Sequence, residues 1–384
     1  MYRNSTVPAR ARRLAWALGM LVLPAGMLLA DASHRGGDSD IDAMIADLGL
    51  REGSVAVRDM PGWNGLRKLV IRLDSPHRLP ALQAVAPNVE IVAVDSVEAA
   101  AAEIADAQAL IGFCNEEILR KGEELHWIQI YWAGIDSCVG NPSLHSGDKV
   151  MTNGQRIASP ALADHAIALM MALARGLDLY HANQLQGKWQ SDVGLAGADF
   201  MELEGRTALV VGLGGIGTQT AKRAHGLGMR VIATRNSRRE GPPYVAYVGL
   251  ADEALELARQ ADVVINTAPL TDATRGMFDA AFFAAMKPTA FFVSVGRGAS
   301  TVTEDLVAAL ENGDIAGAGL DVTDPEPLPP EHPLWTAPRV IISPHTAGRS
   351  GQGRERVFRL VAENLRRYAA GDKLLSVVDI ERGY

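Results

Sequence analysis

"VVGLGGIG", residues 210–217, joins an apolar, β-branched run to closely spaced glycines. Gly212, Gly214 and Gly217 follow this run and open a helical stretch, "IGTQTAKRAHGLG". In a strand–turn–helix unit, the first glycine permits the tight turn, the second lets the backbone approach a pyrophosphate, and the third lets the helix pack on the strand. The helix N-terminus then offers unpaired N–H groups to the phosphates. The stretch therefore predicts a dinucleotide-binding site.

The next strand-like run ends without the acidic residue that usually hydrogen-bonds the adenosine ribose. It reads "VIATRNSRR" and places Arg235 21 residues after Gly214, with Ser237 and Arg238 just behind and a further arginine at 239. A guanidinium can bind a phosphate through two parallel hydrogen bonds. The segment predicts NADPH as the preferred cofactor, with NAD still possible. The alternative is a basic turn that faces only water.

The composition limits the class of protein. The chain has 384 residues, enough for two domains, and 48% of them are hydrophobic, which is typical of a soluble α/β protein. A net charge of -8 argues against nucleic acid as a partner, because binding the phosphate backbone needs clustered Lys and Arg. Two cysteines are too few for a four-cysteine zinc site, and we expect no metal. We interpret Cys114 and Cys138 as separate, inert thiols, and leave their pairing open if the protein is exported.

The N-terminus has the layout of a secretory signal. Four arginines precede the apolar run "LAWALGMLVLPAGMLLA", residues 14–30, which is followed by an A-x-A cleavage pattern ending at Ala32. We expect residues 1–32 to be a cleaved signal peptide or a membrane anchor, so that the protein is exported, periplasmic or membrane-anchored. Any membrane contact would then involve only residues 14–30. A chain that truly starts at Met44 would be cytoplasmic instead.

Alternation of apolar runs with helical stretches predicts two sheet domains. "KLVIRL", "VEIVAV", "ALIGF" and "WIQIYW" are strand-like runs of the first domain. After a long apolar helix at "ALADHAIALMMALARGL", six further runs predict a parallel, helix-covered sheet: "TALVVGLG", "RVIAT", "DVVINTA", "AFFVSV", "AGAGLDV" and "RVIISPH". The closing stretch "GQGRERVFRLVAENLRRYAAG" carries apolar residues at helical spacing, and we expect it to pack on the first domain.

Three segments after the glycine-rich stretch carry the candidate chemistry. They are "SVGRGA" with Arg297, "LDVTDPEPLPPEHPLW" with Asp321 and Glu326, and "IISPHTAG" with His345, and each follows a predicted strand. The carboxyl ends of the strands in a doubly wound sheet line one ligand crevice, so these side chains can converge on a substrate.

On these residues the sequence resembles the D-isomer-specific 2-hydroxyacid dehydrogenase family. The likeness runs from about Ala109 to the C-terminus and includes "GLGGIG", "APLTDATRG", "GRG", "LDV", "EPLP" and "PHTAG" in order. It implies an α/β fold in which a doubly wound, Rossmann-type cofactor domain, residues 156–345, is inserted into a smaller, flavodoxin-like substrate domain, residues 41–155 plus 346–384. Ser294 stands where the family usually has Asn, and "ADH", residues 163–165, replaces the more usual Ala-Glu-His.

The resemblance implies catalytic roles that agree with the chemistry of the side chains. His345 would be the acid/base, Glu326 the carboxylate that stabilises its protonated form, and Arg297 the anchor of the substrate carboxylate and carbonyl. Further contacts would come from backbone amides in "WAGID" and from cofactor-binding residues. The substrate set is Trp132, Ala133, Gly134 and Arg297; the cofactor set is Gly212, Gly214, Gly215, Ile216, Gly217, Arg235, Ser237, Arg238, Ala268, Pro269, Thr274, Val295 and Asp321, the last orienting the nicotinamide carboxamide.

The leading hypothesis is an NADPH-dependent reductase of a small 2-keto acid, of the glyoxylate or hydroxypyruvate type, that yields the D-2-hydroxy acid. One alternative is a regulatory protein of this fold that binds the dinucleotide without catalysis, and another is a phosphite-type dehydrogenase. His165 and His181 are interpreted as structural. Family resemblance implies a homodimer through "HANQLQGKWQSDVGLAGADF", residues 181–200.

Overall fold

The computed structural model describes residues 32–135, 137–193 and 200–380. The described residues from Ile41 onward belong to one compact part of the chain. The expected signal or anchor, residues 1–32, lies outside the described residues except for Ala32. No helix in the described ranges is long and apolar enough to cross a bilayer.

The first sheet is parallel and has the strand order β2-β1-β3-β4-β5. The four apolar runs predicted for this domain form its first four strands, and the fifth was not anticipated. The strands are β1 (Lys68–Arg72), β2 (Glu90–Val94), β3 (Ala109–Ile111), β4 (Trp127–Gln129) and β5 (Val150–Thr152). The helices beside them are α2 (Leu79–Val85), α3 (Val97–Glu103) and α4 (Glu116–Lys121), preceded in the chain by α1 (Ala32–Leu48).

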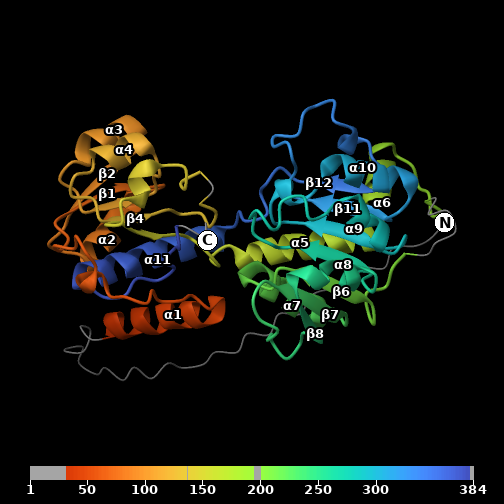
Figure 1. Ribbon diagram of the computed structural model, residues 1–384, viewed down its shortest axis with the longest axis horizontal. Helices are drawn as coiled ribbons and strands as arrows, with labels where there is room; N and C mark the ends of the chain where they lie inside the picture. The colour runs from red at the N-terminus through yellow and green to blue at the C-terminus, as the bar shows by residue number, and fades with distance from the viewer. Residues whose placement is uncertain (1–31, 136, 194–199, 381–384) are drawn as a thin grey trace, which may run out of the picture. The chain divides into compact units, whose positions relative to one another are not determined.

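The second sheet is also parallel, with the order β12-β11-β10-β9-β6-β7-β8 (Figure 1). All six runs predicted for it are strands, and β8 is an addition. The strands are β6 (Thr207–Val211), β7 (Arg230–Arg235), β8 (Tyr247–Leu250), β9 (Val263–Asn266), β10 (Phe291–Ser294), β11 (Gly317–Leu320) and β12 (Val340–Ile342). The helices are α5 (Ser159–Ala174), α6 (Leu177–Leu185), α7 (Gly215–Gly226), α8 (Ala254–Ala258), α9 (Ala280–Ala285) and α10 (Thr303–Asn312). The doubly wound α/β fold is confirmed.

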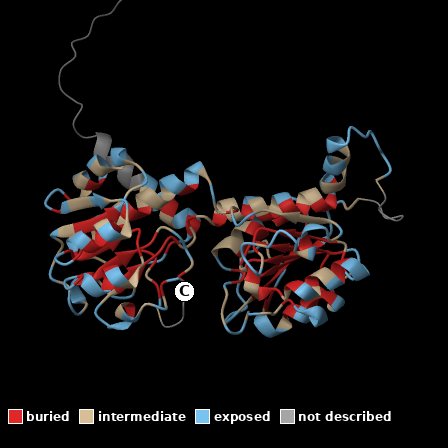
Figure 2. Cartoon of the chain, turned by 90° about the horizontal axis from the view of Figure 1, so that it is seen from above, coloured by how far each residue is buried: buried red, intermediate tan, exposed pale blue. Residues whose placement is uncertain are grey.

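The buried residues are concentrated in the two sheets and on the helix faces that cover them (Figure 2). In the second sheet, strands such as β6 and β9 are buried along their whole length, as expected for parallel strands covered on both faces. Chain order reverses between β6 and β9, because β6, β7 and β8 run outward in one direction and β9 to β12 in the other. Such a switch point is where doubly wound sheets bind ligands.

The last helix, α11 (Gly351–Ala370), belongs to the first sheet, as predicted. Val361, Leu365 and Tyr368 pack in one buried cluster with Leu69 and Trp127 of β1 and β4. Side chains of α11 also form hydrogen bonds with the segments around Glu52 and Leu375, and these bonds strengthen the attachment.

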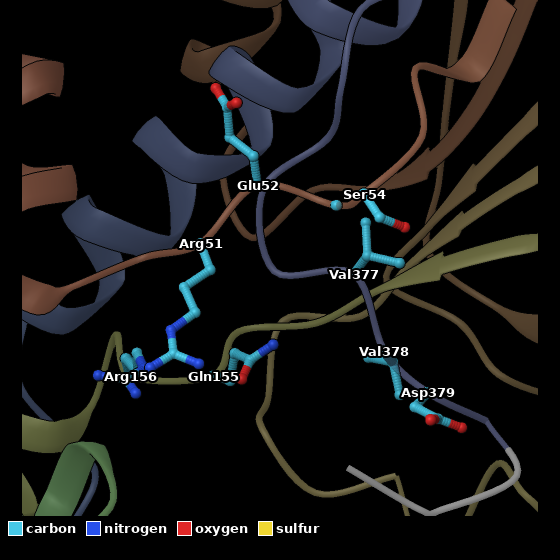
Figure 3. A pocket seen from close by; sticks show the side chains of 9 residues that line it. Arg51, Glu52, Ser54, Gln155, Arg156, Val377, Val378 and Asp379 are labelled. Carbon is cyan, nitrogen blue, oxygen red and sulfur yellow. The ribbon is translucent and has the colours of Figure 1, made fainter. Parts of the chain in front are cut away.

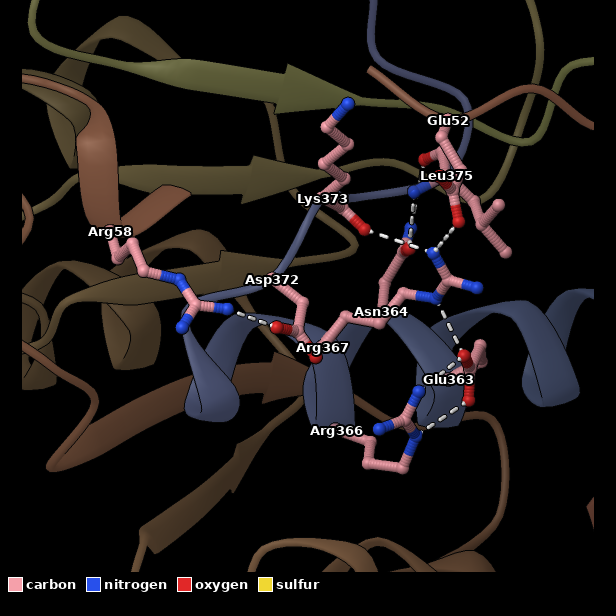
Figure 4. A network of polar contacts seen from close by, with 9 residues as sticks. All are labelled: Glu52, Arg58, Glu363, Asn364, Arg366, Arg367, Asp372, Lys373 and Leu375. Atoms are coloured by element: carbon pink, nitrogen blue, oxygen red, sulfur yellow. Dashed lines mark hydrogen bonds and ion pairs between the residues drawn. The ribbon is translucent and has the colours of Figure 1, made fainter. Parts of the chain in front are cut away.

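Figure 4 shows those polar contacts. Arg367 pairs with Glu363 one turn earlier, and its guanidinium donates to Glu52 Oε1 at 2.6 Å and to the Lys373 carbonyl at 3.0 Å. Asn364, fully buried, donates to the Leu375 carbonyl at 3.1 Å and accepts from its N–H at 2.8 Å. The segments around Glu52 and Leu375 are therefore tied to the same helix.

Cys114 and Cys138 form a disulfide, so the interpretation of two separate thiols is wrong. Cys114 follows β3 and Cys138 lies in the loop after β4, and these strands are hydrogen-bonded neighbours. Their Cα atoms are 5.6 Å apart, within bridging range. The sequence could not reveal this proximity, because it depends on the order of strands in the sheet.

Candidate active site

The glycine-rich turn has the shape that a dinucleotide requires. Gly212 has φ +96°, and a Cβ there would lie 2.8 Å from Ala268 Cα, while a Cβ on Gly217 would overlap the Gly212 carbonyl oxygen. Gly214, in contrast, has no atom within 4 Å of the position of a Cβ, so its backbone face is open. Thr267 holds the turn by donating to the Gly212 carbonyl at 2.7 Å. Gly212 thus permits the tight turn, Gly217 lets the helix pack on the strand, and Gly214 leaves room for a ligand to approach the backbone.

Gly215 and Ile216 begin α7, so the helix N-terminus lies directly after the turn. Its unpaired N–H groups are a site for phosphate. These residues fit a bound dinucleotide pyrophosphate.

Arg235 ends β7, at the position from which a side chain would contact the adenosine ribose of a bound dinucleotide. Its Nε is buried and has no hydrogen-bond partner within the described ranges. Ser237 and Arg238 lie in the exposed turn that follows. Arg239 is engaged elsewhere, because its guanidinium pairs with Glu253 at 2.7 Å. The orphaned guanidinium nitrogen of Arg235 fits an anionic ligand.

Burial and like charge both act on Arg235. Burial is the main cause that lowers the pKa of Arg235. The positive charges of Arg238 and Arg51 lower this pKa further, while the negative charge of Glu240 raises it. A phosphate would relieve both the desolvation and the repulsion. The involvement of Arg51, which lies far earlier in the chain, was not anticipated from the sequence.

The loops after β9 and β10 are aligned by Asn266, which is fully buried. Its amide donates to Ser294 Oγ at 3.0 Å and Ser300 Oγ at 2.8 Å, and its oxygen accepts from the Ala268 N–H at 3.1 Å. Ser294, which departs from the family pattern, is thus a partner of Asn266. Val295 is buried and donates its N–H to the Asn266 carbonyl at 3.1 Å.

Thr274, predicted to contact the cofactor, is bonded within its own loop. Its hydroxyl donates to the Pro269 carbonyl at 2.6 Å and accepts from the Thr271 N–H at 2.8 Å. The side chain shapes the loop that begins at Ala268 and Pro269, beside the glycine-rich turn.

Glu326 and His345 are brought together by neighbouring strands, after β11 and β12. Glu326 Oε1 lies 2.6 Å from His345 Nδ1, and both side chains remain partly exposed, at 42% and 46%. Because Nδ1 faces the carboxylate, Nε2 is the nitrogen available to a ligand. The pair has the geometry of an acid/base group that a carboxylate orients.

His345 has an unusual backbone conformation, with φ +52°. Its N–H donates to the Asp321 carbonyl at 2.8 Å, and the Asp321 carboxylate accepts the N–H groups of Thr346 and Ala347, both at 2.9 Å. Ser343 also donates to this carboxylate, at 2.7 Å. Asp321, which is 1% exposed, therefore holds the loop that carries His345, and this holding role was not predicted.

His165 on α5 belongs to the same network, since its Nε2 lies 2.7 Å from Ser343 Oγ. Its structural interpretation agrees with that contact. His181 lies on α6 and is exposed. Ser343 was missed in the sequence, although its place two residues before His345 was a signal.

Arg297 lies after β10, the strand beside β11, so it is at the same edge of the sheet as Glu326 and His345. Its Nη1 donates to the Gly296 carbonyl at 3.0 Å. A Cβ on the next residue, Gly298, would overlap the Thr323 carbonyl oxygen, so the two loops touch directly.

The predicted cradle at Trp132, Ala133 and Gly134 follows β4 in the other sheet. Asn153 donates to the Ala133 carbonyl at 2.6 Å, and the Gly154 N–H donates to the Trp132 carbonyl at 2.9 Å. Trp132 is 43% exposed.

Tyr131, just before the predicted cradle, is held against the first sheet. Its hydroxyl bonds the Arg72 carbonyl, and its ring packs against the buried cluster that contains Trp127. Burial raises the pKa of Tyr131, so the hydroxyl stays a neutral donor. Trp132 remains as the exposed aromatic residue at this place.

No group of three His, Cys, Asp or Glu side chains in the described ranges is placed to hold a metal ion. The residues present instead fit a dinucleotide, on the shape of the glycine-rich turn and the buried Arg235 nitrogen.

Comparison with known proteins agrees with this geometry. Residues 167–347 match the NAD-binding domain of the D-isomer specific 2-hydroxyacid dehydrogenases. A glyoxylate reductase of Korarchaeum cryptofilum is 34% identical over 277 residues, which cover 70% of this chain and 82% of that protein. A glyoxylate/hydroxypyruvate reductase A of Photorhabdus laumondii is 31% identical over 273 residues, covering 70% and 84%.

A solved structure, a D-isomer specific 2-hydroxyacid dehydrogenase family protein from Aeromonas salmonicida, superposes with a TM-score of 0.72 at 30% identity, covering 82% of this chain and 99% of that one. The sequence likeness and the fold likeness thus extend over both sheets. The chain therefore belongs to the D-isomer-specific 2-hydroxyacid dehydrogenase family and is an NAD(P)-dependent oxidoreductase of that family.

Proposed function

We propose that the protein is an NADPH-preferring reductase that converts a small 2-keto acid, of the glyoxylate or hydroxypyruvate type, to the D-2-hydroxy acid. The observation that carries the proposal is the 2.6 Å contact between His345 Nδ1 and Glu326 Oε1 at the edge of a dinucleotide-binding sheet. The relatives named above, which are glyoxylate and hydroxypyruvate reductases, support the substrate class.

The side chains supply what this reduction needs. Bound NADPH supplies a hydride to C2 of the keto acid. His345 delivers a proton from Nε2 to the carbonyl oxygen, so that the carbonyl becomes a hydroxyl and the ring becomes neutral. Glu326 holds the ring with Nε2 outward and stabilises its positive charge before transfer. Arg297 binds the substrate carboxylate and the carbonyl oxygen as negative charge develops there.

Asp321 acts on this site through the backbone. By accepting the N–H groups of Thr346 and Ala347, it keeps the His345 loop in place, and orientation of the nicotinamide carboxamide stays its second proposed role. The amides at 132–134 are proposed as a second support for the substrate carboxylate.

NADPH preference rests on the chemistry of Arg235. A carboxylate at this place would repel a 2′-phosphate, whereas a guanidinium attracts it, and the Arg235 Nε is buried without a partner. NAD remains possible as a weaker cofactor.

Steady-state turnover of glyoxylate, hydroxypyruvate and pyruvate, each with NADPH and NADH, tests the proposal. We expect turnover of at least one of the three, with kcat/KM at least about tenfold higher for NADPH, which corresponds to roughly 1.4 kcal/mol. His345→Gln should lower kcat by about 100-fold or more, because general acid catalysis contributes that much. His77→Gln is the matched control, since that histidine is exposed on the short 3-10 helix before α2, and it should retain full activity.

Absence of NADPH oxidation with all three acids would contradict the proposal and favour a dinucleotide-binding protein without catalysis. Reduction of NADP⁺ by phosphite, with no keto acid turnover, would contradict the substrate class instead.

Association into a homodimer stays a prediction. Part of the expected contact segment, residues 194–199, lies outside the described residues. Leu185 and Trp189, just before it, are 76% and 102% exposed, which is consistent with a surface that a second copy covers.

A further inference from the structure

A pocket of about 410 Å³ lies where residues 51–54 meet residues 155–156 and 377–379. Figure 3 shows the Arg51 side chain extending toward Arg156 at one end of this pocket, with Gln155 beside them. Two guanidinium groups that share a pocket repel each other, and a bound anion would relieve that repulsion. The chemistry of this end of the pocket therefore favours an anionic ligand.

Arg156 is held there at a cost in backbone conformation. Its φ is +69°, in the left-handed region that favours glycine. Backbone strain at a residue with a long charged side chain points to a use for that side chain. The contacts of the Arg156 side chain therefore indicate its role.

The stem of Arg156 packs on the dinucleotide loop. A Cβ on Gly215, the first residue of α7, would lie 2.9 Å from Arg156 Cγ. Arg156 thus extends over the helix end that faces the cofactor phosphates, and one of its guanidinium nitrogens donates to the Leu48 carbonyl at 3.3 Å.

Arg51 is brought to the same place by the segment after α1. Met44, Leu48 and Leu50 are buried in a cluster with Ile157 and Leu360. Leu50 immediately precedes Arg51, and Ile157 immediately follows Arg156. The buried cluster therefore brings the two arginines to the same part of the structure.

Charge connects this pair with the arginines after β7. Burial lowers the pKa of Arg156 first, and the positive charges of Arg51, Arg235 and Arg238 lower it further. No ion pair joins Arg51 or Arg238 to an acidic side chain in the ranges that the structure describes. The Arg156 guanidinium therefore lies over the glycine-rich turn within reach of the positive charges of Arg51, Arg235 and Arg238. A phosphate monoester, with two negative charges near neutral pH, complements such a group of charges.

We infer that Arg51 and Arg156 complete, with Arg235 and Arg238, a four-arginine site for the 2′-phosphate of the adenosine ribose. The inference rests on the proposed use of NADPH and extends it, because it makes the N-terminal segment a determinant of cofactor choice. In this site, Arg235 and Arg238 come from the end of β7 and the turn after it, and Arg51 and Arg156 come from the pocket.

Calorimetric binding of 2′,5′-ADP and 5′-AMP to the full chain tests the inference, since the two ligands differ only in the 2′-phosphate. We expect Arg51→Gln and Arg156→Gly each to raise the Kd of 2′,5′-ADP by about tenfold, as for loss of a charge-assisted contact, and to leave that of 5′-AMP within about twofold. Arg156→Gly should keep or raise the Tm, because glycine adopts a positive φ without strain. Arg120→Gln, which removes one exposed positive charge on α4, should change neither Kd.

The wild type and Arg235→Asp separate this inference from the proposed function. Equal affinity of the wild type for both ligands would overturn the NADPH preference itself. A preference that Arg235→Asp abolishes, and that both Arg51→Gln and Arg156→Gly retain, would overturn only the role of Arg51 and Arg156. A loss of affinity in these two variants that is the same for both ligands would also overturn it.

Discussion

Gly298 links the two loops that carry Arg297 and Glu326. A Cβ at this residue would overlap the carbonyl oxygen of Thr323, which is backbone and cannot rotate aside. Any side chain would therefore push apart the segment that leads to Glu326 and the segment that begins at Arg297. The close approach of two backbones therefore requires glycine at position 298, the second glycine of "GRG".

Gly298→Ala should therefore separate Glu326 from His345. We expect the free energy of unfolding to fall by about 1–3 kcal/mol, as for overpacking of a close contact, and kcat to fall by at least about tenfold. Denaturant unfolding and steady-state kinetics measure the two effects. Gly226→Ala is the matched control, because a Cβ there meets no atom within 4 Å, and its stability should be unchanged or slightly higher. Wild-type stability and kcat in Gly298→Ala would refute the argument.

Single residues also mark the limit of what the sequence could predict at the site. Glu326 and His345 were identified by their spacing after predicted strands, and the structure places them 2.6 Å apart. Arg51 and Arg156 could not be identified in this way, because their meeting depends on a left-handed residue and on packing between distant segments. Asp321 was named for a ligand contact, whereas its observed bonds go to the backbone of the His345 loop.

At the scale of elements, apolar runs predicted the strands well where they are long and β-branched. β5 and β8 were missed, because "VMT" and "YVGL" are short and are recognised as strands only by their neighbours in the sheet. α1 was missed because its sequence, "ASHRGGDSDIDAMIADL", contains two adjacent glycines and many polar residues. Met44 and Leu48 show that tertiary packing supports its C-terminal half.

β4 and α11 are joined by a buried histidine that should make stability depend on pH. His126, just before β4, contacts the Pro61 carbonyl through Nε2 at 3.0 Å and Tyr368 Oη of α11 through Nδ1 at 3.1 Å. It is 3% exposed, and burial lowers its pKa below the ordinary value of 6.5, despite the opposing effect of the Pro61 hydrogen bond.

Because the unfolded chain binds a proton at His126 more readily than the folded chain, stability should fall as the pH drops below about 6.5. Unfolding by urea at pH 7.5 and 5.5 measures this loss. His126→Gln should lose less stability over the interval, by up to about 1.4 kcal/mol in total, because only about one pH unit separates 5.5 from the ordinary pKa of histidine. An identical pH dependence in the two proteins would show that His126 is not responsible.

At the scale of the whole molecule, the two parallel sheets were predicted and their strand orders were not. Periodicity identifies a strand, but adjacency in a sheet depends on crossovers that the local sequence does not encode. The Cys114–Cys138 disulfide is the clearest case, because it follows from β3 and β4 being neighbours.

The disulfide supports the proposal that the protein is exported, since such bonds persist mainly in oxidising compartments. Thiol labelling of the denatured, unreduced protein from an exported fraction should detect no free cysteine, and labelling after reduction should detect both. N-terminal sequencing of the same fraction should begin after Ala32. Free thiols in that fraction would contradict the disulfide, and a protein found only inside the cell, with Met1 or Met44 at its start, would contradict export.

The strand order of the second sheet has a consequence for how this enzyme can diverge. Of the residues proposed to distinguish the two coenzymes, Arg235 and Arg238 lie at and after the end of β7 on one half of the sheet, and Arg51 and Arg156 lie outside the sheet. Arg297, Glu326 and His345 instead follow β10, β11 and β12 on the other half. Mutations that exchange one coenzyme for another and mutations that alter the reaction therefore fall in separate segments of the chain. Each trait can be selected, or engineered, while the other is left intact.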